Sequence, residues 1–444
     1  MFVTQESGLR AERIQLNQRR KTELKAAVHN RLVDMLNLEK SSLSPTEQLR
    51  AEVRRLVHQI SGEMGVLLSD LERDQFADDV LDETFGLGPL EVLLKDPTIS
   101  DILVNGPEHV YVERQGVIEK SDVRFRDAAH LMHIIDRIVT RVGRRVDESS
   151  PMVDARLLDG SRVNVIIPPL SLDGPMLCIR RFGRCPLTIA NLLELGTLTE
   201  EMVQFLQAAV RSRLNIIISG GTGTGKTTLL NVLSGFVPDT ERIITIEDSA
   251  ELLLQQRHVV RLETRPPNVE GRGEITQRDL VRNSLRMRPD RIIVGEVRGR
   301  EALDMLQAMN TGHEGSLTTV HANSPRDAIS RIEIMVAMAG LDLPVRAVRQ
   351  QFASAIDLII QIGRLPGGRR RLLSISEVTG MEGDIVALQD LFVFRQEGVS
   401  ANGHAYGAFV SEGLRPRCYD RLTRTGHTLP TTLFQKRVLR RIEP

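Results

Sequence analysis

The stretch LNIIISGGTGTGKTTLLNVLSGF, residues 214–236, decides the fold of this chain. It contains the pattern G-x-x-x-x-G-K-[ST] between a strand-like apolar run and a helix-like run, which is the context that a phosphate-binding loop requires. Glycines let the backbone turn its N–H groups toward a phosphate, and the helix that follows adds the positive end of its dipole. We therefore predict that ATP binds to the loop residues Gly221, Thr222, Gly223, Thr224, Gly225, Lys226, Thr227 and Thr228.

Two side chains of this loop have specific predicted roles. Lys226 is expected to reach the β- and γ-phosphates, and the hydroxyl of Thr227 is expected to bind Mg²⁺. The alternative interpretation, in which the loop is a glycine-rich turn with a solvated lysine, does not explain the strand and helix that flank it.

Two glutamates stand where predicted strands end. Glu296 follows RIIVG, and a carboxylate there is suited to the water shell of Mg²⁺. Glu247 follows RIITI, and a buried glutamate at that point is a plausible activator of water. Acids at strand ends also cap helices, and this alternative weighs more for the neighbouring Asp248 and Glu251.

Two histidines flank a predicted strand in TGHEGSLTTVHANS, residues 311–324. His313 and His321 have three interpretations: zinc ligands, structural histidines, or a sensor near the γ-phosphate. Zinc lacks a third ligand in this segment. Spacing alone leaves the three open.

Five arginines precede the loop: Arg156, Arg162, Arg180, Arg181 and Arg184. Surface arginines are ordinarily solvated. A guanidinium is, however, also a natural partner of transition-state phosphate charge, so this cluster is a candidate for reaching the nucleotide from the same or a neighbouring subunit.

Composition limits the class of protein. The 444 residues carry no net charge, so there is no global basic signature of a nucleic-acid binder. The three cysteines, Cys178, Cys185 and Cys418, form neither a zinc motif nor a disulfide framework. The N-terminal segment lacks the apolar core of a signal peptide, and no apolar run approaches the ~20 residues that span a bilayer. We expect a soluble, cytoplasmic chain.

The pattern along the chain predicts four parts. Residues 1–75 read as a helical bundle with a break at 41–45, and residues 76–185 read as an α+β domain with a helix at 128–142 and a hairpin turning at Asp159-Gly160. A joint at 186–198 leads to an α/β domain at 199–444. Its predicted strands, at 214–219, 242–247, 291–296, 316–320 and 356–362, alternate with helices and indicate a mainly parallel sheet.

The order of these motifs resembles the type II/type IV secretion ATPase superfamily. Its Walker A, Asp, Walker B and His boxes match residues 220–228, 245–251, 291–296 and 311–323 in that order. The stretches FGLGPLEVLLKDPTISDILVNGP, IRRFGRCPLT, ETRPPNVEGRGEITQRDLVRNSLRMRPDR and EGDIVALQDLFVF resemble the CpaF-type (TadA-like) ATPase of tight-adherence, or type IVc, pili. This likeness runs from about residue 84 to the C-terminus, and the first 75 residues are less specific.

The resemblance implies a fold, an assembly and a function. The fold is a RecA-like domain preceded by a small PAS-like α+β domain and a helical bundle. The assembly is a cytoplasmic homo-hexamer at the inner membrane, which acts through a platform protein and only indirectly on pilin. Its function is ATP hydrolysis, with Mg²⁺, that drives pilus assembly or retraction, and no nucleic acid is expected.

The resemblance also assigns residues. Glu247 activates water, Glu296 serves the magnesium site, and His321, with His313 as a second candidate, lies near the phosphates. Arg162 and Arg180 contact nucleotide phosphates from the N-terminal side, and Arg156 and Arg181 are weaker candidates. Because Gly295 stands where many ATPases have an Asp, the two glutamates could exchange roles.

Two rival functions remain at this point. A nucleic-acid motor would need a basic, aromatic-lined channel, and this chain has no Trp and three Tyr. A non-catalytic scaffold would bind nucleotide only to set its shape, and it would tolerate the loss of Glu247.

Overall fold

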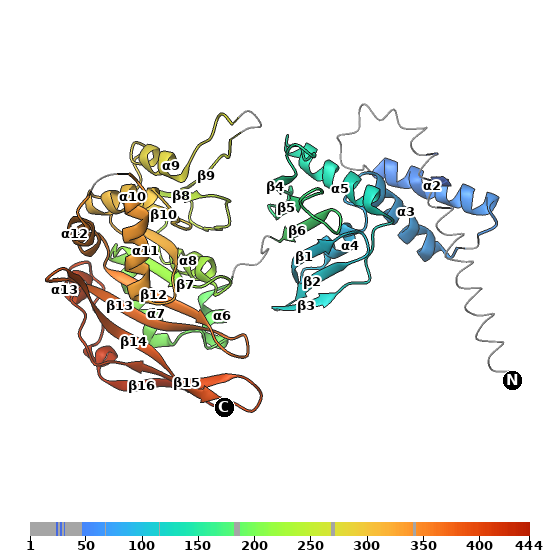
Figure 1. Ribbon diagram of the computed structural model, residues 1–444. Coiled ribbons are helices and arrows are strands. Elements are labelled where there is room, and N and C mark those ends of the chain that lie inside the picture. The colour runs from blue at the N-terminus through green and yellow to red at the C-terminus, as the bar shows by residue number, and fades with distance from the viewer. Residues whose placement is uncertain are drawn as a thin grey trace. The chain divides into compact units, whose positions relative to one another are not determined.

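The computed structural model in Figure 1 describes residues 24, 27, 28, 31, 47–66, 68–114, 116–181, 187–267, 271–340 and 343–444. The predicted break at 41–45, Arg184 and Cys185 lie outside the described residues. The chain divides into two compact units, Met1–Arg184 and Cys185–Pro444. No helix of the described residues is long and apolar enough to cross a membrane.

The first unit begins with a helical pair. Helix α2, Glu47–Glu63, packs Val53 and Val57 against Phe76 and Val80 of α3, Asp70–Thr84. Ser69 starts α3 with a reciprocal capping box, since its hydroxyl accepts the N–H of Glu72. Helix α3 therefore runs across residue 75, where the sequence pattern had placed a domain boundary.

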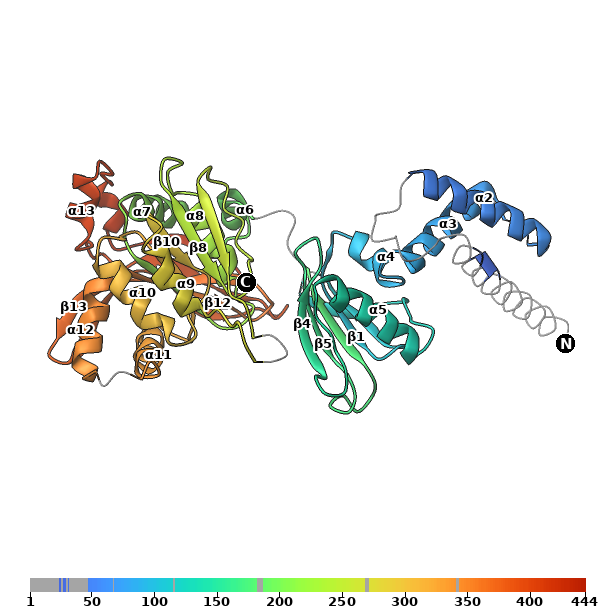
Figure 2. The same cartoon turned by 90° about the horizontal axis from the view of Figure 1, so that it is seen from above.

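The rest of the first unit is an antiparallel sheet covered by a helix. Its elements are α4 (Leu90–Lys95), β1 (Ile99–Asn105), β2 (Val110–Arg114), β3 (Val117–Lys120), α5 (Ala128–Arg141), β4 (Met152–Arg156), β5 (Arg162–Ile166) and β6 (Met176–Arg180). The strand order is β3-β2-β1-β6-β5-β4. Figure 2 shows α5 lying along one face, where its apolar stripe, including Leu131 and Ile135, joins the core. The predicted helix and hairpin are confirmed.

The second unit is built on a ten-stranded sheet with the order β16-β15-β14-β13-β12-β7-β11-β10-β8-β9. Its strands are β7 (Ile216–Gly220), β8 (Ile243–Glu247), β9 (Val259–Glu263), β10 (Arg291–Val294), β11 (Leu317–His321), β12 (Leu358–Arg364), β13 (Arg370–Glu382), β14 (Ile385–Val399), β15 (Ala405–Ser411) and β16 (Arg437–Ile442). Its helices are α6 (Ile189–Glu194), α7 (Glu200–Arg211), α8 (Lys226–Ser234), α9 (Gln277–Ser284), α10 (Glu301–Asn310), α11 (Pro325–Ala337), α12 (Val345–Ala355), α13 (Tyr419–Arg424) and η2 (Thr431–Phe434).

The predicted mainly parallel sheet is only half correct. Strands β12 to β9 pair in parallel, but β13 to β16 continue from β12 as an antiparallel meander. Short connections explain the switch, because the links between β12, β13 and β14 are far too short for the crossover that parallel neighbours need. The strand predicted at 291–296 also ends early, at Val294, so Glu296 lies in the segment after the strand.

Helices cover both faces of this sheet, and the alternation along β7 shows how. Ile216 and Ile218 face a core that includes α7 and α8, whereas Ile217 faces a core that includes α10, α11 and α12. Because the parallel strands run the same way, their carboxyl ends share one edge, which carries Gly220, Glu247, Val294 and His321.

Candidate active site

The predicted phosphate loop joins β7 to α8. Gly223 and Gly225 have φ of +70° and +96°, a backbone region that side chains with a Cβ rarely adopt. The loop carbonyl of Gly221 accepts hydrogen bonds from the Thr224 hydroxyl at 2.9 Å and from Lys226 Nζ at 2.8 Å. The lysine is thus folded over the loop, with its charge held at the N-terminus of α8.

Lys226, His321 and Glu296 form a contiguous polar chain beside the loop. Lys226 Nζ lies 3.3 Å from His321 Nε2, which lies 3.2 Å from Glu296 Oε1. Burial lowers the pKa of both Lys226 and His321, and it outweighs the opposing attraction of Glu296. The structure therefore brings together three residues that the sequence proposed separately.

Arg298, which the sequence analysis missed, holds Glu296 from the other side. Its Nε and Nη2 donate to the two carboxylate oxygens of Glu296 at 2.8 and 2.9 Å, and its Nη1 lies 3.9 Å from Asp248. Burial would raise the pKa of Glu296, but the hydrogen bonds and charge of Arg298, helped by His321 and Lys226, lower it. The sequence feature that could have indicated this role is the position of Arg298, two residues after a glutamate that ends a predicted strand.

Glu247 ends β8 in a different environment. It is 3% exposed, and its Oε2 accepts the N–H groups of Glu251 at 2.7 Å and Leu252 at 3.0 Å. Oε1 is buried without a hydrogen-bond partner among the described residues. Burial raises the pKa of Glu247 to about 7, although these backbone hydrogen bonds oppose the rise. A buried acceptor with a pKa near neutrality is the property expected of a general base.

Gly295 makes room for Glu247. Glu247 ends β8, and Gly295 directly follows the neighbouring strand β10. The Gly295 N–H donates to the Ile246 carbonyl at 2.9 Å. A Cβ added to Gly295 would lie 2.8 Å from Glu247 Cγ and 3.3 Å from its Oε2. The glycine that departs from the usual Asp is thus the residue that admits the buried carboxylate.

The donor set at this edge fits Mg²⁺ and the phosphates of a nucleotide. Thr227, in the first turn of α8, supplies a hydroxyl, and Glu296 supplies an ionised carboxylate; oxygen ligands of both kinds suit Mg²⁺. The unpartnered Oε1 of Glu247 points to a missing polar neighbour such as water.

The model of the family of Type II/IV secretion system proteins matches residues 83–401. The chain belongs to this family. It is 39% identical to a putative conjugal transfer protein of Mycobacterium tuberculosis over 312 residues, which cover 69% of this chain and 88% of that protein. It is 33% identical to the conjugal transfer protein TrbB of Rhizobium radiobacter over 66% of this chain and 86% of TrbB.

Solved structures of similar proteins include the VirB11 ATPase of the Brucella suis type IV secretion system in complex with sulphate. That structure is 29% identical, with a TM-score of 0.36, over 66% of this chain and 97% of its own. The pilus retraction motor PilT with bound ADP is 23% identical, with a TM-score of 0.49, over 64% of this chain and 81% of its own.

The candidate arginines of this family member lie in the first unit, in one row of its sheet. Arg156, Arg162 and Arg180 are register partners across β4, β5 and β6, and Arg180 Nε pairs with Asp101 Oδ1 at 3.0 Å. Arg181 differs from them, because it donates to the carbonyls of three residues around the start of β1: Leu94, Asp96 and Ile99. Arg181 therefore braces the fold.

The two histidines lie at opposite edges of the sheet. His321 ends β11 at the carboxyl edge, whereas His313 precedes β11 at the amino edge. The four strand residues 317–320 lie between them and rise ~3.3 Å each, which excludes a shared metal ion and places His313 away from the loop. No group of three possible metal-ligating side chains occurs within the described part of the chain.

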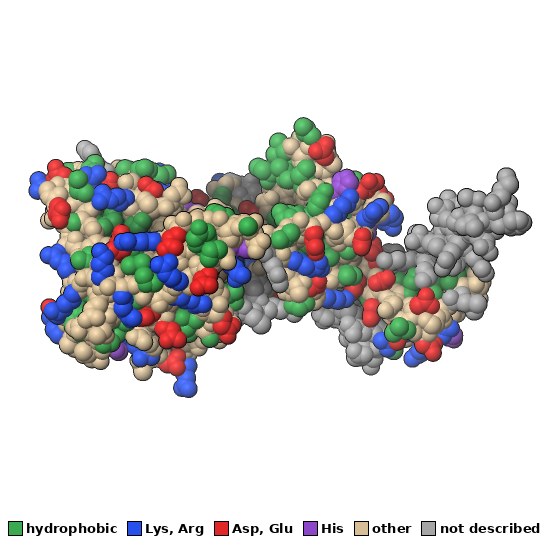
Figure 3. Space-filling view, turned by 90° about the horizontal axis from the view of Figure 1, so that it is seen from below, with side chains coloured by type: hydrophobic (Ala, Val, Ile, Leu, Met, Phe, Trp, Pro, Cys, Tyr) green, Lys and Arg blue, Asp and Glu red, His purple; other side chains and the backbone are tan. Residues whose placement is uncertain are grey.

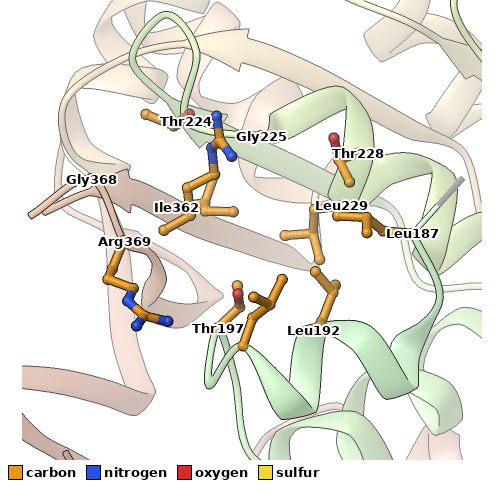
Figure 4. A pocket seen from close by; sticks show the side chains of 12 residues that line it. Leu187, Leu192, Thr197, Thr224, Gly225, Thr228, Leu229, Ile362, Gly368 and Arg369 are labelled. Atoms are coloured by element: carbon orange, nitrogen blue, oxygen red, sulfur yellow. The ribbon is translucent and has the colours of Figure 1, made fainter. Parts of the chain in front are cut away.

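A pocket of about 150 Å³ opens beside the loop (Figure 4). Its wall comes from the segment around α6, from the loop and α8, and from the β12–β13 hairpin: Leu187, Leu192, Leu195, Thr197, Thr224, Gly225, Thr228, Leu229, Ile362, Gly368, Arg369 and Arg370. The sequence analysis did not find this pocket, because its residues come from three separate segments.

Proposed function

We propose that this protein is an ATPase subunit that hydrolyses ATP with Mg²⁺ at the carboxyl edge of its second unit. One observation carries the proposal: a phosphate loop with Lys226 lies beside two carboxylates, Glu296 and Glu247, whose environments push their pKa values in opposite directions. A pair of acids with separated pKa values is what a metal ligand and a general base require.

The environments favour one assignment of roles. Lys226 and the loop N–H groups bind the β- and γ-phosphates, while Thr227 and the ionised Glu296 hold Mg²⁺, which when bound neutralises charge on the phosphate oxygens. Glu247 takes the proton of the attacking water on its unpartnered Oε1. His321, between Lys226 and Glu296, is placed to respond to the γ-phosphate.

The pocket beside the loop suits the base of the nucleotide. Its leucines offer an apolar surface for a flat ring, and the Thr197 hydroxyl and nearby arginines offer polar contacts. A nucleotide lying across the loop then has its base at this pocket and its γ-phosphate toward His321.

We infer the assembly and the cellular task from the sequence likeness. We propose a cytoplasmic homo-hexamer in which Arg162 and Arg180, from the PAS-like α+β part of the first unit, reach the nucleotide. The ring would drive assembly or retraction of a Tad, or type IVc, pilus through an inner-membrane platform protein. The names of the relatives favour a second candidate in the same class, the export of a macromolecule in conjugal transfer or type IV secretion.

A nucleic-acid motor is less favoured. On the face of the second unit shown in Figure 3, basic and acidic side chains are interspersed and form no continuous basic stripe. Stimulation of ATP hydrolysis by single-stranded DNA would support that rival.

The test is ATP hydrolysis by the purified full-length chain with Mg²⁺. Lys226→Ala should abolish nucleotide binding or turnover while assembly persists, and Lys436→Ala, which changes a lysine outside the loop and the pocket, should behave as wild type. Hydrolysis that is undiminished in Lys226→Ala would refute the site. In cells, loss of pili on deletion supports the pilus role, whereas intact pili with lost export supports the second candidate.

A further inference from the structure

The sheet topology gives the phosphate loop two different sides. Strand β7, which leads into the loop, lies between β11 and β12. On one side of β7, strand β11 ends at His321, β8 ends at Glu247, and Glu296 follows β10. These groups are assigned above to the γ-phosphate, to water and to Mg²⁺. Strand β12 and the hairpin to β13 lie on the other side, with the pocket. Side chains of the β12–β13 hairpin therefore lie at the end of the site that we assign to the base of the nucleotide.

This hairpin places Arg370 directly on the loop. Arg370 Nε donates to the Gly223 carbonyl at 3.1 Å, and its Cδ lies 3.3 Å from the point where a Cβ on Gly225 would stand. Both Arg369 and Arg370 line the pocket, and Figure 4 shows Arg369 on the wall that faces Leu192 and Thr197. The hairpin thus forms a cationic wall beside Thr228, the residue that follows the metal-binding Thr227.

The charge of this wall is not compensated within the protein. Among residues 187–267, 271–340 and 343–444, neither Arg369 nor Arg370 has a carboxylate within ion-pair distance. Other exposed arginines of the same unit do have one: Arg395 pairs with Glu412 at 2.7 Å, and Arg437 pairs with Glu201 at 3.1 Å. An unpaired guanidinium held against a phosphate loop is prepared for an anion.

We propose that Arg370 is a nucleotide-binding residue that contacts the α-phosphate or ribose end of the bound nucleotide. This rests on the proposed ATP-binding function and adds to it a cation on the side opposite Lys226. The α-phosphate and ribose are the same in ATP and ADP, so Arg370 binds ground state and transition state alike. The contact strengthens nucleotide binding without accelerating the chemical step.

The experiment compares Arg370→Ala, Arg370→Gln and Arg370→Lys in the full-length chain. Kd for ATP and for ADP is measured by calorimetry, and KM and kcat are measured for ATP. We expect Arg370→Ala and Arg370→Gln to weaken both nucleotides about tenfold, as the loss of a charge-assisted hydrogen bond does, and to raise KM similarly while kcat stays within about twofold. Arg370→Lys, which keeps the charge, should retain part of the affinity.

The matched control is Arg364→Gln. Arg364 is an exposed arginine of the same hairpin and the register partner of Arg370, but it does not line the pocket. Its Kd values should equal those of wild type. An equal loss of nucleotide affinity in Arg364→Gln would mean that the overall positive charge of the hairpin attracts the nucleotide. That result would overturn a specific contact with Arg370.

Other results would overturn the proposal in distinguishable ways. Wild-type affinity in Arg370→Gln, which keeps an N–H for Gly223, would mean that Arg370 only braces the loop, and a lowered Tm of Arg370→Ala without nucleotide would mean the same. A loss of affinity for ATP but not for ADP in these variants would mean that Arg370 contacts the γ-phosphate instead of the α-phosphate or ribose. Failure of wild type itself to bind either nucleotide would refute the proposed function, and this inference with it.

Discussion

Replacing Glu247 by Gln should inactivate the enzyme and yet stabilise its fold. The folded protein holds the pKa of Glu247 at about 7, whereas an ordinary glutamate has 4.5. The difference of about 2.5 pH units, at ~1.4 kcal/mol per unit, corresponds to about 3 kcal/mol. Gln is neutral at every pH, and its side-chain carbonyl can still accept the N–H groups of Glu251 and Leu252.

The sign of the effect follows from proton counting. Below pH 4.5 the carboxyl of Glu247 is protonated in both the folded and the unfolded state, so it does not change the free energy of unfolding. Between 4.5 and 7 the folded state keeps a proton that the unfolded state loses, so the stability of wild type falls as pH rises. Above 7 the folded state carries the full cost of a buried charge. Relative to wild type, Glu247→Gln should gain about 1.4 kcal/mol at pH 5.5 and about 3 kcal/mol at pH 8.5.

Scanning calorimetry of both proteins at pH 5.5 and 8.5, without nucleotide, measures this difference. The gain should rise by about 2 kcal/mol between the two pH values, which for a unit of this size corresponds to a Tm difference that grows by roughly 4–8 °C. Glu296→Gln is the control. The pKa of Glu296 is lowered by its partners, so that variant loses stability at both pH values. If Glu247→Gln is no more stable than wild type at pH 8.5, or gains equally at both pH values, the burial argument is wrong.

Three further outcomes follow from the same geometry. Gly295→Ala should lower stability by about 1–3 kcal/mol and reduce kcat, because its Cβ would stand 2.8 Å from Glu247 Cγ; an unchanged Tm and kcat would contradict this contact. The kcat of wild type should fall as pH drops through about 7, where Glu247 takes up a proton, and a flat profile between pH 6 and 8 would argue against Glu247 as the base. Glu247→Gln should trap bound ATP with little turnover, whereas Glu296→Gln should mainly raise the Mg²⁺ concentration needed for hydrolysis; the reverse result would mean that the two glutamates exchange roles.

The sequence predicted those parts of the site that depend on local pattern. An apolar run before glycines and a lysine specifies a strand, a loop and a helix, and β7 and α8 begin and end close to the predicted bounds. Apolar runs likewise located β8, β10 and β11. The predicted strands placed Glu247 and Glu296 at strand ends, whereas the expectation that His321 lies near the phosphates came from the family resemblance.

The sequence could not predict what depends on the path of loops and on side-chain direction. The strand before Glu296 ends two residues early, and the turn that follows brings Arg298 back onto the same carboxylate. The hydrophobic periodicity of a sequence does not indicate that a side chain beyond a strand turns back onto the glutamate at its end. Similarly, Arg370 and Gly223 are 147 residues apart in the sequence, and nothing in either segment alone indicates their contact. The antiparallel half of the sheet was missed because alternation identifies a strand but not its neighbour's direction.

The absence of an Asp before Glu296 has a physical explanation in the packing of two strands. In the register of β8 and β10, the side chain of Glu247 occupies the space in front of Gly295, so an Asp there would collide with it. The two carboxylates consequently come from neighbouring strands and meet different surroundings. Arg298 and His321 keep Glu296 ionised, while burial keeps Glu247 near the point where it exchanges a proton.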